Sequence, residues 1–407
     1  MSEPPSPPHR LRDIPPGIWA LGFVSLLMDI SSEMIHALLP VYLVTVLATS
    51  MVTVGIIEGI AEATASVVKV FSGALSDRIG QRKLLAVIGY GLAALTKPVF
   101  PLASSVGWLV AARFIDRIGK GIRGAPRDAL IADIAPDHLR GASFGLRQSL
   151  DTIGAFLGPG LAIGLMWLTS SDFQVVFWIA VIPAFLSFGL IVFAVHDVAR
   201  PDGLRKVASP LSRTELKNLG ASYWVVVGFA TVFTLARFSE AFLILRAQAV
   251  GLPMVLVPLV LVVMNVVYAL SAYPAGALSD RFDRMTMLLT GFALLIAADL
   301  VLAATDGLIG VTIGVILWGL HMGFTQGLLS TLIADAAPAE LRGTAYGMFN
   351  LLAGLAALAA SVLAGLLWDS LGASAMFLGG AGFTAIALVG FVIVRQRMPH
   401  LGASLKS

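Results

Sequence analysis

Gly73-Ala-Leu-Ser-Asp77-Arg78 recurs letter for letter as Gly276-Ala-Leu-Ser-Asp280-Arg281, 203 positions further along a chain of 407 residues. A second pair of segments, LIADIAPDHLRGASFG at 130–145 and LIADAAPAELRGTAYG at 332–347, agrees at 10 of 16 positions with a spacing of 202. Two matches in nearly the same register, each about half a chain apart, indicate a tandem duplication. The chain is therefore predicted to consist of two related halves.

The composition indicates that most of the chain lies in lipid. Hydrophobic residues make up 57% of the sequence and charged residues only 13%, whereas a soluble domain carries about 25% charged residues. About twelve apolar runs of about 20 residues are long enough to cross a bilayer as helices. They lie near 18–43, 53–75, 84–103, 107–131, 142–168, 173–195, 221–247, 253–277, 285–304, 308–332, 344–368 and 374–394. The sequence therefore predicts an all-α membrane protein with 12 transmembrane helices in two pseudo-symmetric six-helix bundles.

The distribution of basic residues predicts the orientation and the domain boundaries. Most of the 27 lysines and arginines fall in the two tails and in the loops that follow even-numbered spans. By the positive-inside rule, both termini and the central linker face the cytoplasm. The expected segments are a disordered proline-rich tail at 1–17, a first bundle at 18–195, a linker at 196–219, a second bundle at 220–394 and a tail at 395–407. The excess of positive charge is thus a topological signal and does not indicate a nucleic-acid partner.

Several functional classes are excluded or disfavoured. The chain has no cysteine, which excludes disulfides, thiolate metal sites and thiol catalysis. Gly119-Lys-Gly121-Ile-Arg-Gly124 matches a dinucleotide-binding pattern, but it lies within a span and lacks the necessary βαβ context. Its glycines instead suit close helix packing. One histidine beside Asp29 and Glu33 is a thin ligand set for a metal, and no catalytic triad or nucleotide-hydrolysing loop is present. We therefore expect no enzyme activity, no cofactor and no metal.

The loop between the second and third spans carries a family resemblance. Gly73-x-Leu75-x-Asp77-Arg78-x-Gly80-x-Arg82-Lys83 resembles the signature loop of the major facilitator superfamily, and a degenerate copy follows the eighth span. The span count and the half-chain repeat agree with this resemblance. It implies two parallel six-helix bundles, transport by alternating access, and a central cavity to which spans one, two, four and five contribute from the first half.

The resemblance also implies a gate at the cytoplasmic surface. Gly73 permits close helix approach, and Asp77 is expected to face the positively polarised amino end of span eleven near Gly343. The gating residues on this interpretation are Gly73, Asp77, Arg78, Gly80 and Arg82, with Asp280 and Arg281 in the second copy. Because the second copy lacks the glycine and one basic residue, we expect it to form a weaker latch. The alternative is that these charges only fix the topology.

Ionisable residues within the spans are the strongest functional indication, because they are costly in a bilayer. Asp29 and Glu33 share one face of span one, and Glu58 and Glu62 share one face of span two. Two carboxylates one turn apart disfavour simultaneous ionisation unless a lysine or arginine compensates. We interpret these four residues as proton-coupling candidates; the alternative is a static network of buried ion pairs. Lys97 and Asp299, at equivalent positions in the two halves, are a candidate structural pair.

The remaining polar residues of the spans are predicted to line the substrate cavity. These are His36, Arg113, Asp116, Arg117, Lys120, Arg147, Asp151, Arg237, Glu240, His321 and Gln326. If the carboxylates pair all of the bases, a lipophilic substrate is expected; if pairing is incomplete, an anion is favoured. The sequence slightly favours complete pairing, because the carboxylates of the first half are numerous.

Span five carries Gly154, Gly158 and Pro159, which predict a helix kink and resemble a signature of exporting antiporters. The alternative is a packing kink without bearing on direction. Taken together, the sequence predicts a proton-coupled antiporter that exports a small organic compound, a drug or a metabolite, as a monomer in the inner membrane of a bacterium. Proton-coupled uptake or exchange of an organic anion is the alternative, and metal-ion transport, a receptor or a membrane enzyme are less favoured.

Overall fold

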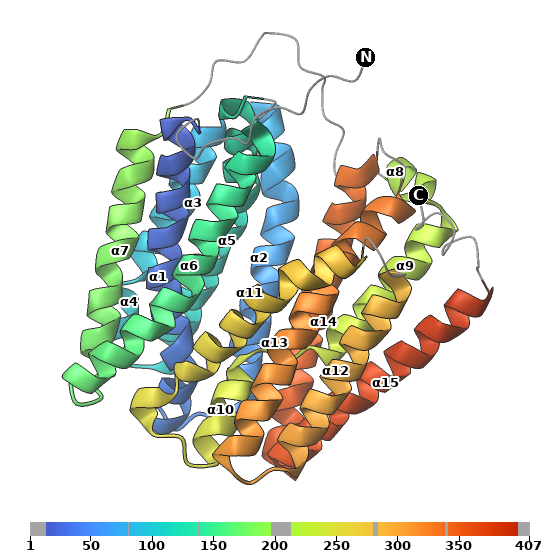
Figure 1. Ribbon diagram of the computed structural model, residues 1–407. Coiled ribbons are helices and arrows are strands. Elements are labelled where there is room, and N and C mark those ends of the chain that lie inside the picture. Colours follow the sequence, from blue (N-terminus) through green and yellow to red (C-terminus); the bar gives the residue numbers. More distant parts are fainter. Residues whose placement is uncertain are drawn as a thin grey trace.

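The computed structural model describes residues 14–79, 81–136, 139–196, 213–279, 284–337 and 341–397, and within these ranges the regular structure is helical, without strands. The first half contains α1 (Pro16–Thr45), α2 (Met51–Ile79), α3 (Arg82–Thr96), α4 (Val99–Leu102), α5 (Val106–Ile134), α6 (Arg140–Leu168) and α7 (Phe173–Ala194). The second half contains α8 (Arg213–Asn218), α9 (Gly220–Ala236), α10 (Ala241–Ala249), η3 (Met254–Leu256), α11 (Leu259–Ser279), α12 (Arg284–Ala304), α13 (Leu308–Ala336), α14 (Arg342–Leu371) and α15 (Ala373–Arg397). Figure 1 shows the two halves side by side. Most of the predicted tails and linker (1–13, 197–212 and 398–407) lies outside the described residues.

The number of spans agrees with the prediction. Among the described residues, 11 helical segments are long and apolar enough to cross a membrane. The segment that does not meet this criterion is α5, whose 29 residues include a stripe of charged side chains. Because α5 packs between α2 and α3, it completes the first bundle as its fourth span. The predicted all-α membrane fold of two six-helix bundles is confirmed.

Two spans that were predicted as continuous helices are interrupted. The third span ends as α3 at Thr96 and resumes as α4 beyond Pro98, which lacks a backbone donor. The seventh span, predicted at 221–247, breaks at 237–240 between α9 and α10. In contrast, α6 runs without interruption through Pro159. The break in the seventh span matters for function, because unwound backbone at membrane depth is tolerated where it lines a cavity.

The hydrophobic core shows how the two halves meet. One large cluster joins the second part of α1, around Leu38, to residues of α9 and α10 such as Phe233 and Phe242. Near the beginning of α1 the core is divided, because one cluster is confined to the first half and another to the second. The halves therefore share a core at one end and separate toward the end at which α1 begins, as Figure 1 also shows.

The helices α2 and α14 form the main contact between the halves. A side chain at Gly55 would lie 2.1 Å from the Ser361 carbonyl oxygen, so this crossing requires glycine. At the shared-core end, Asp369 of α14 accepts hydrogen bonds from the backbone N–H groups of Met51 (3.0 Å) and Val52 (2.9 Å). Because they lie in the first turn of α2, these N–H groups have no hydrogen-bond acceptor within the helix itself. Asp369 therefore caps a helix of the opposite half and favours closure of this end.

We expect Asp369→Ala to weaken closure at the shared-core end, by about 0.5–2 kcal/mol, because the start of α2 loses its cap. The chain is naturally free of cysteine, so Ser361→Cys, a buried position opposite Gly55, can report opening through its rate of thiol labelling. Labelling should become faster in the Asp369→Ala background. The control is Asp172→Ala, since Asp172 caps α7 within one half. Equal labelling rates in both backgrounds would contradict a role between the halves.

Candidate functional site

Two adjoining cavities are lined by residues of both halves. One has a volume of about 300 Å³ and lies mainly among α1, α2, α5 and α6. The other has a volume of about 450 Å³ and extends to the break between α9 and α10 and to α14. Glu33, Glu62, Ser66, Lys120 and Ala155 line both cavities, which therefore form one continuous central site.

Glycines of α6 determine the shape of the first-half wall. A side chain at Gly154 would lie 2.9 Å from Asp29 Cβ, and one at Gly158 would lie 2.7 Å from Glu33 Cβ. These glycines let α6 lie directly against the backbone of α1 at the positions of its two acids. Because Asp151 precedes Gly154 by one turn, it lies on the same face of α6. The glycine motif thus brings three carboxyl groups together.

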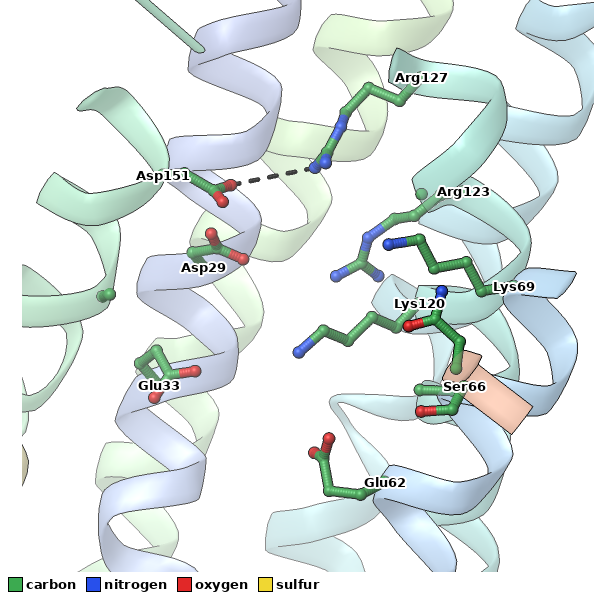
Figure 2. Close-up of a pocket in the computed structure, with 13 residues that line it drawn as sticks. Asp29, Glu33, Glu62, Ser66, Lys69, Lys120, Arg123, Arg127 and Asp151 are labelled. Atoms are coloured by element: carbon green, nitrogen blue, oxygen red, sulfur yellow. Dashed lines mark ion pairs between the residues drawn. The ribbon is translucent and has the colours of Figure 1, made fainter. Parts of the chain in front are cut away.

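Asp29 and Asp151 form a carboxyl pair across two helices. Figure 2 shows the two groups facing each other, and they lie within hydrogen-bonding reach. Two ionised carboxylates have only acceptors, so a bond between them requires one shared proton. Asp151 also pairs with Arg147 at 2.9 Å and lies 3.9 Å from Arg127. Among the described residues, no basic side chain lies within ion-pair distance of Asp29.

Glu58 and Glu62 each have their own arginine, as the sequence analysis allowed. Arg113 donates to both oxygens of Glu58, at 3.0 and 3.3 Å, and this pair is buried. Arg117 lies 3.6 Å from Glu62. Both glutamates can therefore be ionised together. Neither forms a carboxyl pair of the kind seen at Asp29.

His36 connects spans one and two. Its Nδ1 lies 3.3 Å from Glu33, and its Nε2 lies 3.6 Å from Glu58. A doubly protonated imidazole donates from both nitrogens, so His36 suits a position between two carboxylates. This bridge, together with the Glu58–Arg113 pair, links α1, α2 and α5.

A second buried network of charged side chains connects α5 to Lys97 and to α1. The Lys97 ammonium donates to Asp116 at 3.0 Å and to the Ser32 hydroxyl at 3.0 Å. Asp116 also lies 3.5 Å from Arg117. Lys97 and Asp116 are 1% and 2% exposed, and neither lines the two cavities. Lys97 therefore pairs within its own half, so the expected pairing with Asp299 is wrong.

Several bases remain without an acidic partner, so the pairing expected from the sequence is incomplete. In the described part of the chain, Lys69 and Lys120 form no ion pair within 4 Å, although both line the cavity. Arg123 stacks over the Tyr90 ring at 4.9 Å, and one of its terminal nitrogens has no hydrogen-bond partner within the described ranges. Figure 2 shows Lys69, Lys120 and Arg123 on one side of the cavity and Asp29, Glu33 and Asp151 on the other. Apart from Glu62, which projects from α2 on the basic side, the acids and bases therefore lie on opposite sides of the site.

The second half contributes fewer charges. Arg237 and Glu240 flank the helix break and line the larger cavity together with Asn265. His321 is fully buried, with Nδ1 3.1 Å from the Trp318 carbonyl, and neither it nor Gln326 lines the two cavities. Arg113, Asp116 and Arg147 likewise do not line the two cavities. Their predicted cavity roles therefore stay predictions.

The predicted gate is only partly visible. A side chain at Gly73 would lie 3.3 Å from Ala125 Cβ, which agrees with the expected close approach of α2 to another helix. Arg82 pairs with Asp133 at 2.7 Å and donates to the Ala129 carbonyl, both in α5. The side chains of Asp77 and Arg78, and all of Gly80, Asp280 and Arg281, lie outside the described residues.

The glycines of the apparent dinucleotide motif are explained by packing. Gly119 lies against the Gly89 carbonyl of α3, and Gly121 lies against Val68 and the Ala65 carbonyl of α2. A side chain at either position would approach backbone oxygens within 3.0 Å. The prediction that these glycines serve helix packing is confirmed for Gly119 and Gly121. Among the described residues there is also no cluster of three or more potential metal ligands.

Comparisons with known proteins agree with the fold. The sequence profile of the family described as "Major Facilitator Superfamily" matches residues 21–360 and 225–406. An uncharacterised MFS-type transporter of Methanocaldococcus jannaschii is 32% identical over 365 residues, which cover 88% of this chain and 89% of the relative. The quinolone resistance protein NorA of Staphylococcus aureus is 27% identical over 180 residues, 44% of this chain and 45% of that protein. The solved structure of the nucleoside transporter NupG aligns with a TM-score of 0.78 at 13% identity, covering 92% of this chain and 99% of that one.

Proposed function

Because the chain belongs to the major facilitator superfamily, whose members are membrane transporters and not enzymes, we propose that it is a proton-coupled antiporter that exports a small organic compound. The observation that carries this proposal is the Asp29–Asp151 carboxyl pair beside a cavity between the halves. A shared proton held there is released when a cation takes its place. Exchange of a proton for a substrate at one site is the requirement for antiport.

The direction of transport is supported by the partial match to a quinolone resistance protein. Gly154 and Gly158, which the sequence analysis associated with exporting antiporters, lie directly against the coupling acids of α1. The proposed orientation places the beginning of α1 in the cytoplasm. In that orientation the halves separate toward the cytoplasm, and Asp369 favours closure of the opposite end. On this proposal the protein acts as a monomer in a bacterial cytoplasmic membrane.

The alternative, uptake or exchange of an organic anion, is supported by a different observation. Lys69 and Lys120 present ammonium groups to the cavity without a carboxylate partner within ion-pair distance among the described residues. An anion would supply that partner. The gating roles proposed for Asp77 and its neighbours apply equally to both alternatives, because alternating access is common to them.

The proposal is tested in proteoliposomes that contain a pH-sensitive dye. With an acidic lumen, external addition of a substrate should raise the lumenal pH, because substrate entry drives proton exit. A panel of organic cations, anions and zwitterions is added in turn, with protein-free liposomes as the control. Substrate flux without any change in lumenal pH would contradict proton coupling, and a fall in lumenal pH would indicate symport.

A further inference from the structure

From the charges of the central cavity we infer that its ligand is a small zwitterion, with an ammonium group held by the carboxyl side and an anionic group held by Lys120 and Lys69. The inference rests on the proposed transport function and specifies the substrate class of the same site. It follows from two observations: the separation of opposite charges across the cavity, and the balance of these charges.

The separation of charges is visible in Figure 2. Asp29, Glu33 and Asp151 project from α1 and α6 on one side. Lys69, Lys120 and Arg123 project from α2 and α5 on the other side, together with Glu62 of α2, which already pairs with Arg117. A ligand with two opposite charges can pair with both sides at once, whereas a ligand with one charge leaves one side without a partner.

The anionic group of the ligand would have two defined partners in the protein, Lys120 and Lys69. Lys120 lines both cavities, and Lys69 lines the smaller one, where each contributes a flexible ammonium group. Neither is held in an ion pair among the described residues, so a carboxylate or phosphate of the ligand does not have to displace a protein partner. In contrast, Arg113 and Arg117 are already engaged with Glu58 and Glu62.

The cationic end has an equally defined position. Among the carboxyl groups that line the smaller cavity, Asp29 is the one without a basic partner within ion-pair distance in the described part of the chain, and it lies beside Asp151. Two carboxyl groups in contact attract either a proton or an ammonium group. The ammonium group of a zwitterion would therefore replace the shared proton, which links substrate binding to proton release.

The balance of charges argues against ligands with a single charge. Four carboxyl groups and four basic groups line the smaller cavity: Asp29, Glu33, Glu62 and Asp151 against Lys69, Lys120, Arg123 and Arg127. Once the proton shared by Asp29 and Asp151 has left, these charges balance, and a zwitterion keeps them balanced. A lipophilic cation would instead leave Lys69 and Lys120 desolvated without a counter-charge, which is unfavourable at membrane depth. The volumes of about 300 and 450 Å³ suit a compact metabolite.

The test is calorimetric binding to the purified full-length protein in detergent, at fixed pH and without a gradient. The probes are ω-amino acids of two to eight carbons, each compared with the carboxylic acid and the alkylamine of the same length. We expect at least one ω-amino acid to bind with a Kd about tenfold or more below those of its two matched analogues. Equal binding of the alkylamine, or no binding by any ω-amino acid, would overturn the inference.

Variants of Lys120 and Lys69 test whether these residues bind the anionic group of the ligand. Lys120→Gln should raise the Kd of the zwitterion by about tenfold and leave that of the alkylamine unchanged, while Lys120→Arg should retain the preference. Lys69→Gln provides a second, independent position. Lys217→Gln, on the exposed surface of α8, is the matched control. Unchanged zwitterion binding in both Lys120→Gln and Lys69→Gln would also refute the assignment.

The two proposals fail in different ways. Zwitterion binding without gradient-driven transport would remove proton coupling but keep the ligand class. Proton-driven transport of a lipophilic cation, with no binding of zwitterions, would keep the transport function and remove the ligand class.

Discussion

Asp29→Asn should abolish gradient-driven accumulation, while exchange of substrate across the membrane in the absence of a gradient should continue at a reduced apparent affinity, because Asp151 keeps its carboxylate. In the wild-type protein, a pH difference of two units can sustain about 100-fold accumulation at one proton per substrate, since each unit corresponds to about 1.4 kcal/mol. The amide cannot take up and release the proton shared with Asp151. The substrate concentrations inside and outside the proteoliposomes should therefore become about equal. The measurement is uptake of a labelled substrate, found in the dye screen, into proteoliposomes with an acidic lumen.

Asp29 is preferable to Asp151 for this test. Replacing Asp151 would leave Arg147, which lies 2.9 Å away, without its closest acid, and the resulting damage would not be specific to proton transfer. The charged groups that face the pair are Arg127 and Arg147 on the side of Asp151 and Lys120 and Arg123 on the side of Asp29. None of them is lost in Asp29→Asn.

The control is Asp172→Asn. Asp172 caps α7 outside the cavity, and asparagine is an equally good capping residue, so this variant should accumulate substrate like the wild type. If Asp29→Asn retained accumulation driven by the pH difference, the proton would be carried elsewhere. Glu33, Glu58 and Glu62 would then be the remaining candidates from the sequence analysis.

The fold was predictable from the sequence because its determinants are repeated along the chain. The sequence alone shows both determinants: the two copies of the Gly-Ala-Leu-Ser-Asp-Arg segment and the regularly spaced apolar runs. The breaks in the third and seventh spans were harder to predict from the sequence. Pro98 signals the first break, but the break at 237–240 contains no proline or glycine that would signal it.

The candidate site was predictable in its composition but not in its pairing. Helical periodicity places Asp29 with Glu33 and Glu58 with Glu62, because it relates residues of one helix. The contacts that matter join different helices, and one sequence does not reveal which helix faces are neighbours. Gly154 is the residue that brings Asp151 to Asp29, and its spacing from Asp151 is the signal that could have indicated this pair.

Equivalent positions in the two halves were also misleading as a guide to contacts. Lys97 and Asp299 correspond by the repeat, yet Lys97 pairs with Asp116. Asp299 is completely buried, and neither of its carboxyl oxygens has a hydrogen-bond partner among the described residues. A duplication relates the environments of two residues and does not bring the residues themselves together.

Asp116→Asn should destabilise the fold more than any single replacement on the cavity surface, by about 3–5 kcal/mol, because it leaves a buried charge without its partner. Among the described residues, Lys97 has one acidic partner, Asp116, and otherwise contacts the neutral Ser32 hydroxyl. In the same part of the chain, Asp116 has two basic partners, Lys97 at 3.0 Å and Arg117 at 3.5 Å. The two members of the pair are therefore not equivalent.

This asymmetry predicts the outcome of a double-mutant cycle. Lys97→Met should cost less than Asp116→Asn, because Arg117 still balances the remaining carboxylate. The double variant should be more stable than Asp116→Asn alone, since the uncompensated ammonium is then removed. Reversible unfolding in mixed micelles provides the free energies, and the Asp172→Asn variant provides the baseline for an exposed acid. A larger loss for Lys97→Met than for Asp116→Asn would contradict the network, because it would mean that Arg117 does not share the charge of Asp116.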